Sequence, residues 1–166
     1  MKILETERLV LETLEEDSID DLAKLLANER VHKFFPKTLT RAESCEFLKK
    51  VQQRQHTDGV SFWGVFRKND QRFLGICGLL KQTVDEVEET EVAYRISDEF
   101  WGKGYGTEAA KGCTKYAQDV LKSASVISLI LEENVQSIRV AEKNGLQFEK
   151  VSIFHGQPHR VYRKPL

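Results

Sequence analysis

The sequence is poor in the residues that mark specialised architectures. Its 166 residues include only three cysteines, three prolines and ten glycines, which excludes disulfide-rich, collagen-like and low-complexity proteins. Cys45, Cys77 and Cys113 stand more than thirty residues apart, so no CxxC pair forms and one thiol must stay unpaired. We therefore expect a reducing compartment, the cytoplasm.

Long apolar runs and an excess of one charge are also missing. The first seven residues carry acids where a signal peptide needs an apolar core, and no run approaches the length that crosses a bilayer. The 25 basic and 26 acidic side chains give a net charge of -1, which provides no overall attraction to nucleic acid. We expect neither a membrane nor a nucleic acid as partner.

The apolar residues, 40% of the chain, recur with helical period in some segments and with strand period in others. Strands are expected over 8–13, 62–66, 73–80, 91–96 and 126–131, with two more between 148 and 162. Helices are expected over 18–28, after Thr40, over 105–121 and after Asn134. No repeat or linker interrupts this order, so we expect one domain over residues 1–166 that mixes α and β structure, with an antiparallel meander at 60–97.

Local signals add detail to this outline. Ser18 with Asp21, and Thr40 with Glu43, have the spacing of helix capping boxes. The acidic segment 85–89 is predicted to be a solvated turn and sheet edge. The strand at 126–131 follows a helix, which predicts a βαβ crossover and a parallel neighbour in the sheet.

The segment 101–109, Trp-Gly-Lys-Gly-Tyr-Gly-Thr-Glu-Ala, lies between an expected strand and the clearest expected helix. Alternate glycines let the backbone curl with its N–H groups inward, and the helix adds its unpaired amides and positive end. This arrangement favours a phosphate or pyrophosphate. The spacing fits neither the Rossmann fingerprint nor a P-loop. By local spacing alone, a turn that only joins a strand to a helix is an equal alternative.

Together with Glu-Val-Ala-Tyr-Arg-Ile at 91–96, Asn-Val-Gln-Ser at 134–137 and Glu-Lys-Asn-Gly-Leu at 142–146, this turn resembles the GNAT superfamily of N-acetyltransferases. The similarity covers nearly the whole chain and is greatest to the branch of the ribosomal-protein alanine and serine N-acetyltransferases. It implies an α+β domain with a central twisted mixed sheet of six to seven strands, flanked by about four helices, and acetyl-CoA as cosubstrate without a metal.

The resemblance also assigns residues to the cofactor. Backbone amides of the turn would hold the coenzyme A pyrophosphate, and the side chain of Lys103 would add positive charge. The residues of this turn are Gly102, Lys103, Gly104, Tyr105, Gly106 and Thr107. Pantetheine would pair with the strand that holds Arg95 and Ile96, and Asn134 would bind the cofactor near its reactive end. Trp101 stands where the family pattern has Arg or Gln, a departure common in this branch.

Glu91 is the candidate base for the amine, because it begins the strand before the cofactor turn, where members of the similar family often carry one. The alternative is a surface acid in an acidic run, which would only attract cationic amines. Its neighbours Asp85, Glu86, Glu88 and Glu89 look solvated.

The departing thiolate needs a proton or a hydrogen bond. Many relatives in the resembled family place a tyrosine seven residues after the equivalent of Asn134, but Ala141 stands there in this chain. Ser137 faces the same helical side as Asn134 and takes that role by resemblance. The alternative for Ser137 is a helix cap or a packing group, and Tyr162 is a second candidate acid.

Other reactive or aromatic side chains receive simpler interpretations. His155 and His159 flank a Gly-Gln-Pro turn and are interpreted as hairpin residues, not metal ligands. No cysteine has a histidine nearby in sequence, which gives an acyl-cysteine route little support. Trp63 is expected in the core, whereas Phe34 and Phe35 occupy the loop that often forms the acceptor pocket in the resembled family.

The sequence therefore predicts an acetyl-CoA-dependent N-acetyltransferase that works by direct attack in a ternary complex. The acceptor is a primary amine, either a protein N-terminal α-amine or a small molecule, and the protein is a monomer or a homodimer. One alternative is a non-catalytic acyl-CoA-binding or sensing module, which the absence of the usual tyrosine leaves open. A purely structural partner-binding domain is the third interpretation.

Overall fold

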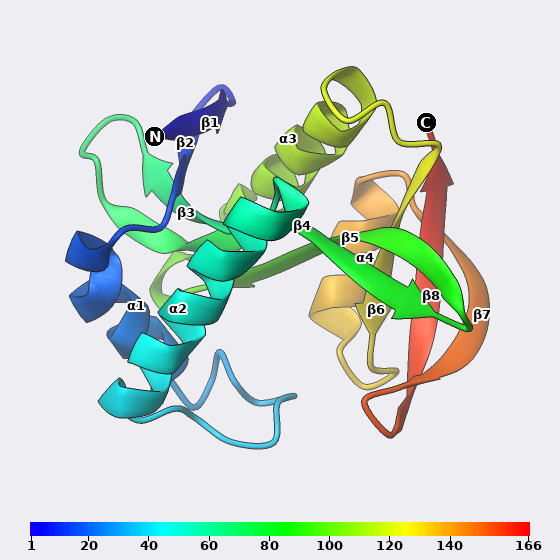
Figure 1. Ribbon diagram of the computed structural model, residues 1–166, viewed down its shortest axis with the longest axis horizontal. Coiled ribbons are helices and arrows are strands. Elements are labelled where there is room, and N and C mark those ends of the chain that lie inside the picture. The colour runs from blue at the N-terminus through cyan, green and yellow to red at the C-terminus, as the bar shows by residue number, and fades with distance from the viewer.

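The chain folds around one eight-stranded mixed sheet, seen in a computed structural model that describes residues 1–166 (Figure 1). The strands are β1 (Lys2–Glu5), β2 (Leu9–Thr13), β3 (Phe62–Arg67), β4 (Phe73–Val84), β5 (Val87–Ile96), β6 (Ser125–Ile130), β7 (Gln147–Phe154) and β8 (Gln157–Pro165). The helices are α1 (Ile19–Leu26), α2 (Arg41–Asp58), α3 (Tyr105–Asp119) and α4 (Val135–Lys143), with short 3-10 turns at Glu16–Ser18 and Asp98–Phe100. The predicted α+β class is confirmed.

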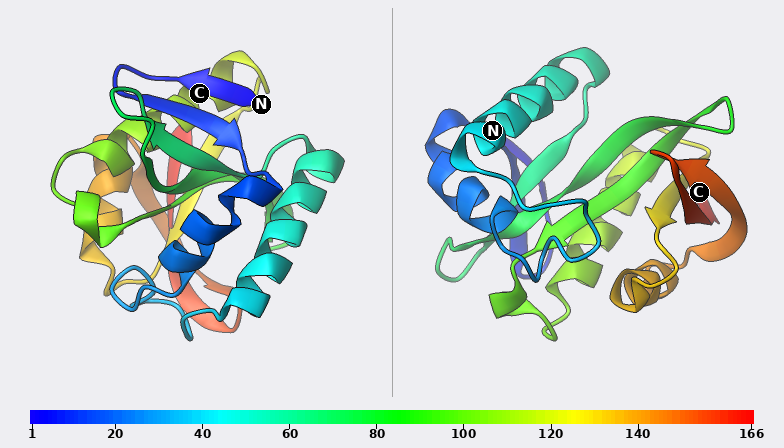
Figure 2. Two further views of the ribbon diagram at one scale, coloured as in Figure 1. Left: turned by 90° about the vertical axis from the view of Figure 1, so that its left-hand side faces the viewer. Right: turned by 90° about the horizontal axis from the view of Figure 1, so that it is seen from below.

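The strand order is β1-β2-β3-β4-β5-β6-β8-β7, and every neighbouring pair is antiparallel except β5 and β6. Those two parallel strands share a single paired position, Glu91 with Ile127. Beyond it they diverge, so the sheet splits into a half that ends at β5 and a half that begins at β6 (Figure 2). The α3 crossover between β5 and β6 is the βαβ unit that the sequence predicts.

Helices cover both faces of the sheet, because successive strand residues point to opposite sides. On one face, α1 and α2 pack on a cluster that includes Ile76 and Leu80 of β4. On the other face, α3 and α4 pack on a larger cluster that includes Cys77 and Leu79 of the same strand. Trp63 is fully buried in this larger cluster, as predicted. No helix is both long and apolar enough to cross a bilayer.

The two expected capping boxes have different outcomes. At α2, the Glu43 amide donates to Thr40 Oγ1 and the Thr40 amide donates to Glu43 Oε1, so this capping box is confirmed. At α1, the side chain of Ser18 caps nothing. Ser18 has helical backbone angles because it already ends the 3-10 turn before α1, whereas a capping residue needs an extended backbone.

The sheet is larger than the six to seven expected strands, because β1 forms from a short N-terminal segment that pairs with β2. The acidic segment is also only partly a turn. Asp85 and Glu86 turn the β4–β5 hairpin with φ of 49° and 67°, but Glu88 and Glu89 lie inside β5. The expectation that Glu89 is solvated is wrong, because its side chain is only 11% exposed and forms an ion pair with Arg163 of β8.

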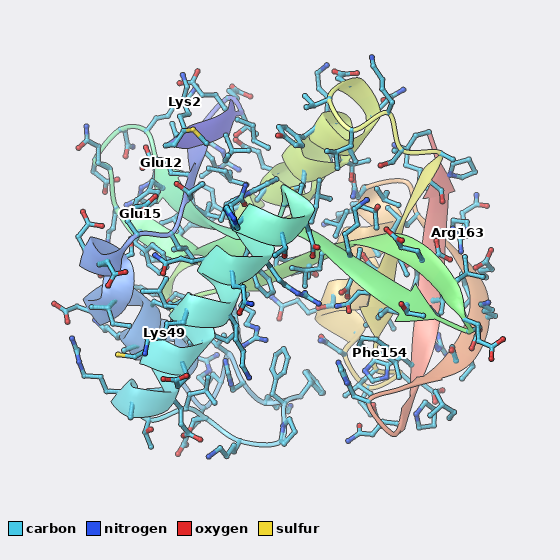
Figure 3. The ribbon with its side chains drawn as sticks, viewed as in Figure 1. Lys2, Glu12, Glu15, Lys49, Phe154 and Arg163 are labelled. Carbon is cyan, nitrogen blue, oxygen red and sulfur yellow. The ribbon has the colours of Figure 1, made fainter.

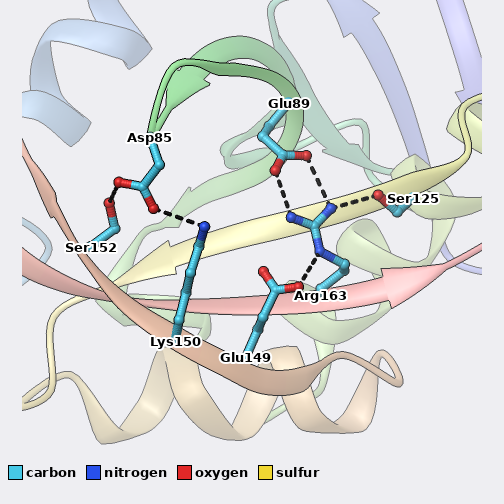
Figure 4. Close-up of polar contacts among 7 residues, drawn as sticks. All are labelled: Asp85, Glu89, Ser125, Glu149, Lys150, Ser152 and Arg163. Atoms are coloured by element: carbon cyan, nitrogen blue, oxygen red, sulfur yellow. Dashed lines mark hydrogen bonds and ion pairs between the residues drawn. The ribbon is translucent and has the colours of Figure 1, made fainter.

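The β4–β5 hairpin is joined to the second half of the sheet by polar contacts (Figure 4). Arg163 donates to both carboxylate oxygens of Glu89, at 3.0 and 2.5 Å, and also to Ser125 of β6 and Glu149 of β7. At the hairpin turn, Asp85 accepts a 2.7 Å hydrogen bond from Ser152 and forms a 2.8 Å ion pair with Lys150. These contacts hold the two halves together at the closed end of the split.

Candidate active site

A cleft of about 1140 Å³ occupies the split between β5 and β6. Its floor is formed by β5 and β6, and its rim by the glycine turn, the N-terminus of α4, the α1–α2 connection and the β7–β8 hairpin. Phe34 and Phe35 of the α1–α2 connection line the cleft. Phe154, at the end of β7 where the β7–β8 hairpin turns, also lines it (Figure 3). The cleft thus opens at the carboxyl ends of two parallel strands, where α/β proteins commonly bind ligands.

The glycine turn enters α3 with two residues in the left-handed region, Gly102 at φ 78° and Gly104 at φ 82°. A Cβ at Gly102 would meet nothing within 4 Å, and one at Gly104 would meet only Arg8 at 3.4 Å. Backbone conformation, not crowding, therefore requires glycine at these positions. Gly104 is the N-cap of α3 and no side chain caps the helix. The first amides of α3 are free for an anion, which fits a pyrophosphate.

Glu108 lies in the first turn of α3 and would repel an anion there if its charge were unpaired. Thr6 and the backbone of Arg8 both donate to Glu108 Oε2, and Arg8 Nε donates to Oε1 at 2.7 Å. Arg8 also donates to the Lys103 carbonyl and lies 4.4 Å from the centre of the Tyr105 ring. Arg8 neutralises this acid and supports the turn, a role that sequence analysis missed because the two partners are 100 residues apart.

The two expected cofactor residues of β5, Arg95 and Ile96, point to opposite faces of the strand. Tyr94 and Ile96 face α3, since a Cβ added to Gly106 would lie 3.8 Å from each side chain. Arg95 therefore points to the opposite face of β5, where its guanidinium lies 3.2 Å from the imidazole of His32 in the α1–α2 connection, at the other side of the cleft. The Ile96 carbonyl already accepts a 2.8 Å hydrogen bond from the indole of Trp101. Trp101, the departure from the family pattern, thereby connects the turn to the end of β5.

Asn134 and Ser137 lie together at the start of α4, and both line the cleft. The Asn134 side-chain oxygen accepts the backbone N–H of Ser137 at 3.3 Å, which makes Asn134 the N-cap of this helix. The Ser137 side chain is half-buried. Ala141 is buried one turn further on, in the core against α3. No hydroxyl from that turn reaches the cleft.

Glu91 is buried in the floor of the cleft, with 8% of its surface exposed. Burial raises its pKa from 4.5 to about 7, against the opposing effects of Gln82, the Leu129 backbone, Arg54 and Arg95. Gln82 Nε2 donates to Glu91 Oε1 at 3.0 Å. The surface acid that the acidic surroundings in sequence suggested is therefore excluded, and this carboxyl titrates near neutral pH.

Tyr94 is a cleft residue that sequence analysis did not single out. Its hydroxyl lies 3.5 Å from the Ser137 carbonyl oxygen, on the α3 side of β5. Burial raises the pKa of Tyr94, so its hydroxyl stays protonated and acts as a hydrogen-bond donor. The alternation of residues 91–96 could have placed it on this face. Tyr162, the alternative acid, is buried against Phe148 and does not line the cleft.

The other candidate groups lie apart from this chemistry. His155 and His159 are on the β7–β8 hairpin at the edge of the cleft, and no group of three metal-ligating side chains converges anywhere in the chain. The thiols of Cys77 and Cys113 form a 3.6 Å hydrogen bond in the core, are not joined by a disulfide and lie outside the cleft lining. Burial raises the pKa of Cys113, which makes it a poor nucleophile.

Comparison with known proteins agrees with this geometry. The family described as "Acetyltransferase (GNAT) domain" matches residues 8–147. Among curated relatives, YkkB of Bacillus subtilis is 30% identical over 97% of this chain and 94% of its own, and the N-acetyltransferase YoaA of the same species is 25% identical over 90% and 85%. A ribosomal L7/L12 α-N-protein acetyltransferase, RimL, solved in complex with coenzyme A, has the same fold with a TM-score of 0.80, 13% identity and coverage of 100% and 98%.

Proposed function

The chain belongs to the GNAT acetyltransferases, and from this premise we propose that it transfers the acetyl group of acetyl-CoA directly to a primary α-amine within a ternary complex. The observation that carries the proposal is the position of Glu91, a buried carboxyl in the floor of a cleft whose rim is an uncapped helix N-terminus. Such a cleft can hold a pyrophosphate at one end and a proton acceptor at the other.

The residues that would hold acetyl-CoA are those of the glycine turn and its surroundings. The amides of the segment 102–107 suit the pyrophosphate, and the exposed Lys103 adds positive charge. Asn134 and the backbone of Arg95 line the path between β5 and α4. Acetyl-CoA supplies an activated thioester, so this chain has to orient the two substrates and handle protons.

Glu91 accepts the proton of the incoming ammonium group in this proposal. With a pKa of about 7, the carboxyl is about half ionised at neutral pH. Proton transfer from a peptide α-amine, of pKa about 8, costs about 1.4 kcal/mol, whereas transfer from a lysine-like amine of pKa about 10.4 costs about 4.6 kcal/mol. Because an α-amine has the lower pKa, its deprotonation by Glu91 is favoured over that of an ε-amine by about two orders of magnitude.

Ser137 and Tyr94 supply two hydroxyl groups beside the N-terminus of α4 for the departing thiolate. Both line the cleft, and Tyr94 lies within 3.5 Å of the Ser137 backbone. A tyrosine with a raised pKa cannot readily give its proton to a thiolate, which is the weaker base. We assign both hydroxyls as hydrogen-bond donors that stabilise the departing sulfur, with Ser137 in the position nearest the helix N-terminus.

Peptide acetylation tests the proposal against the binding-module alternative. The readout is thiol release from acetyl-CoA with a lysine-free peptide that has a free N-terminus, compared with an N-terminally blocked peptide that contains one lysine. We expect kcat/KM for the α-amine to be higher by about 100-fold. Equal rates would overturn the assignment of an α-amine.

A parallel measurement of thermal stability with acetyl-CoA separates the two classes of function. A bound ligand stabilises the folded state whether or not it reacts. Stabilisation without thiol release, across α-amines and small amines, would identify a non-catalytic acyl-CoA-binding module. The absence of any stabilisation would refute both interpretations. We further propose a cytoplasmic protein, because its three cysteines are free thiols.

A further inference from the structure

Arg95 is a cationic side chain of the cleft that has no carboxylate partner. Arg30, which also lines the cleft, pairs with Asp98 at 3.0 Å. By contrast, the side chain of Arg95 makes a polar contact with the imidazole of His32, where Arg95 Nη1 lies 3.2 Å from His32 Nε2. Burial lowers the pKa of Arg95 only to about 10, so it remains charged at neutral pH. Glu91 acts on Arg95 through its charge but forms no ion pair with it, so the free donors of this half-buried guanidinium need an explanation.

The groups around Arg95 hold it in place without neutralising it. Burial lowers the pKa of His32, and the neutral ring can donate from Nδ1 to the Lys37 carbonyl at 3.1 Å while Nε2 accepts from Arg95. Three aromatic rings surround the guanidinium, with centroids 4.1, 5.2 and 5.6 Å from Cζ, at Phe35, Phe47 and Phe62. The imidazole uses one of five guanidinium N–H donors, which leaves donors for a ligand.

Arg95 and Glu91 lie on the same face of β5, four residues apart, and both line the cleft. Their Cα atoms are therefore separated by about 13 Å along the strand. The charged groups that act on Glu91 are Arg54 of α2 and Arg95 itself. An acceptor whose amine lies at Glu91 can place a second group at Arg95 if its two groups are less than about 13 Å apart, the length of about four extended residues.

We propose that Arg95 binds a carboxylate of the acceptor, so that the preferred substrates are α-amines with an acidic group within the first few residues. This inference rests on the proposed function and specifies the substrate class of the same site. A carboxylate matches the planar fork of one guanidinium, with two parallel hydrogen bonds. A phosphate dianion would carry a second negative charge that this single guanidinium does not balance.

Matched peptide amides test this proposal. Ser-Asp-Ala-Ala-amide and Ser-Asn-Ala-Ala-amide differ only in a carboxylate against a carboxamide, and a second pair moves the change to the third residue. The variants are Arg95→Met, which keeps the apolar stem, Arg95→Lys, which keeps the charge without the fork, and Lys33→Gln as a control for an exposed cation that also lines the cleft. Thiol release gives kcat/KM for each combination.

We expect the unmodified protein to prefer the carboxylate member of at least one pair by about tenfold or more. Arg95→Met should reduce this preference to less than about twofold, a ratio in which any change of rate common to both members cancels, Arg95→Lys should be intermediate, and Lys33→Gln should keep the preference. Equal kcat/KM for both members of each pair in the unmodified protein would overturn the proposal. An equal loss for both members in Arg95→Met would do the same, because it indicates a purely structural role.

Calorimetric binding of the N-acetylated peptides separates this proposal from the proposed function, because it needs no turnover. Tighter binding of the acidic peptide that Arg95→Met abolishes, without thiol release from any peptide, would support the carboxylate site and refute transfer. Thiol release without any preference, in reaction or in binding, would support transfer and refute the site. Stabilisation of Arg95→Met by acetyl-CoA verifies that the variant is folded. If Arg95→Met is not folded, the comparison of the two peptide pairs with the unmodified protein still tests the carboxylate site.

Discussion

Replacement of Glu91 by glutamine is expected to change activity and stability in opposite directions. Glutamine keeps the shape of the side chain and can still accept the 3.0 Å hydrogen bond from Gln82. It cannot accept a proton, so the proposed deprotonation step is lost. Removal of a general base typically lowers kcat by about 100-fold or more. The same change removes a buried group whose ionisation opposes folding.

The size of the stability change follows from the pKa of Glu91. Its value in the folded protein is about 7, above the ordinary 4.5. The folded protein therefore favours the protonated carboxyl. Its contribution to the free energy of unfolding is fully present below about pH 4.5 and is lost as the pH rises through 7. The difference between the pKa values of 4.5 and about 7 corresponds to about 3 kcal/mol of folding stability, at about 1.36 kcal/mol per pH unit. Glu91→Gln should therefore be more stable than the unmodified protein at pH 8 by about 2–3 kcal/mol, and by less than about 1 kcal/mol at pH 5.

Urea unfolding at pH 5 and pH 8 measures these differences, and thiol release from pH 5.5 to 9 measures activity. The unmodified protein should show kcat/KM that rises about tenfold per pH unit below about pH 7, as Glu91 ionises, and falls above about pH 8, as the α-ammonium group of the substrate loses its proton. Glu88→Gln is the matched control, since Glu88 is an exposed acid on the same strand. The reasoning fails if Glu91→Gln is less stable than the unmodified protein at pH 8, or if it keeps activity within about threefold.

Three further perturbations have defined outcomes. Gln82→Leu removes a hydrogen bond that favours the ionised Glu91, so the rise in kcat/KM should move to higher pH by about one unit; an unchanged or lower midpoint would contradict this. Gly104→Val places a branched side chain at φ 82° beside the amides of α3, and thermal stabilisation by acetyl-CoA should be lost while the protein remains folded. Arg163→Met leaves the Glu89 carboxylate half-buried without its partner, and urea unfolding should show a loss of about 2 kcal/mol, smaller in high salt; no change would show that this pair adds nothing.

Features with a local cause could be predicted from the sequence. The capping box of Thr40 depends on contacts within four residues, and the glycine turn depends on φ angles that glycine alone adopts easily. Ser18 had the same local pattern, yet the preceding 3-10 turn gave it helical backbone angles. Short-range patterns are thus reliable only where the flanking backbone allows them.

Features created by distant partners could not be predicted. Glu91 belongs to an acidic run in sequence, but it is buried because β6 lies beside it and α2 brings Arg54 above it. The contact between His32 and Arg95 joins residues 63 positions apart, from a loop and a strand. No local sequence pattern at His32 or Arg95 predicts this contact, because hydrophobic periodicity indicates which face a residue occupies and not which side chain it meets.

The ion pair between Glu89 and Arg163 lies at the apex of the wedge between β5 and β6, whereas the glycine turn and Ile96 lie near its open mouth. From Glu91 to Ile96 the strand forms a lever arm of about 16 Å. A rotation of about 4° at the apex would therefore displace the mouth by about 1 Å, a misplacement that can cost an enzyme about 100-fold in rate. The side chains of Glu89 and Arg163 touch neither substrate. By fixing the angle between β5 and β6, they nevertheless set how the two reacting substrates are aligned.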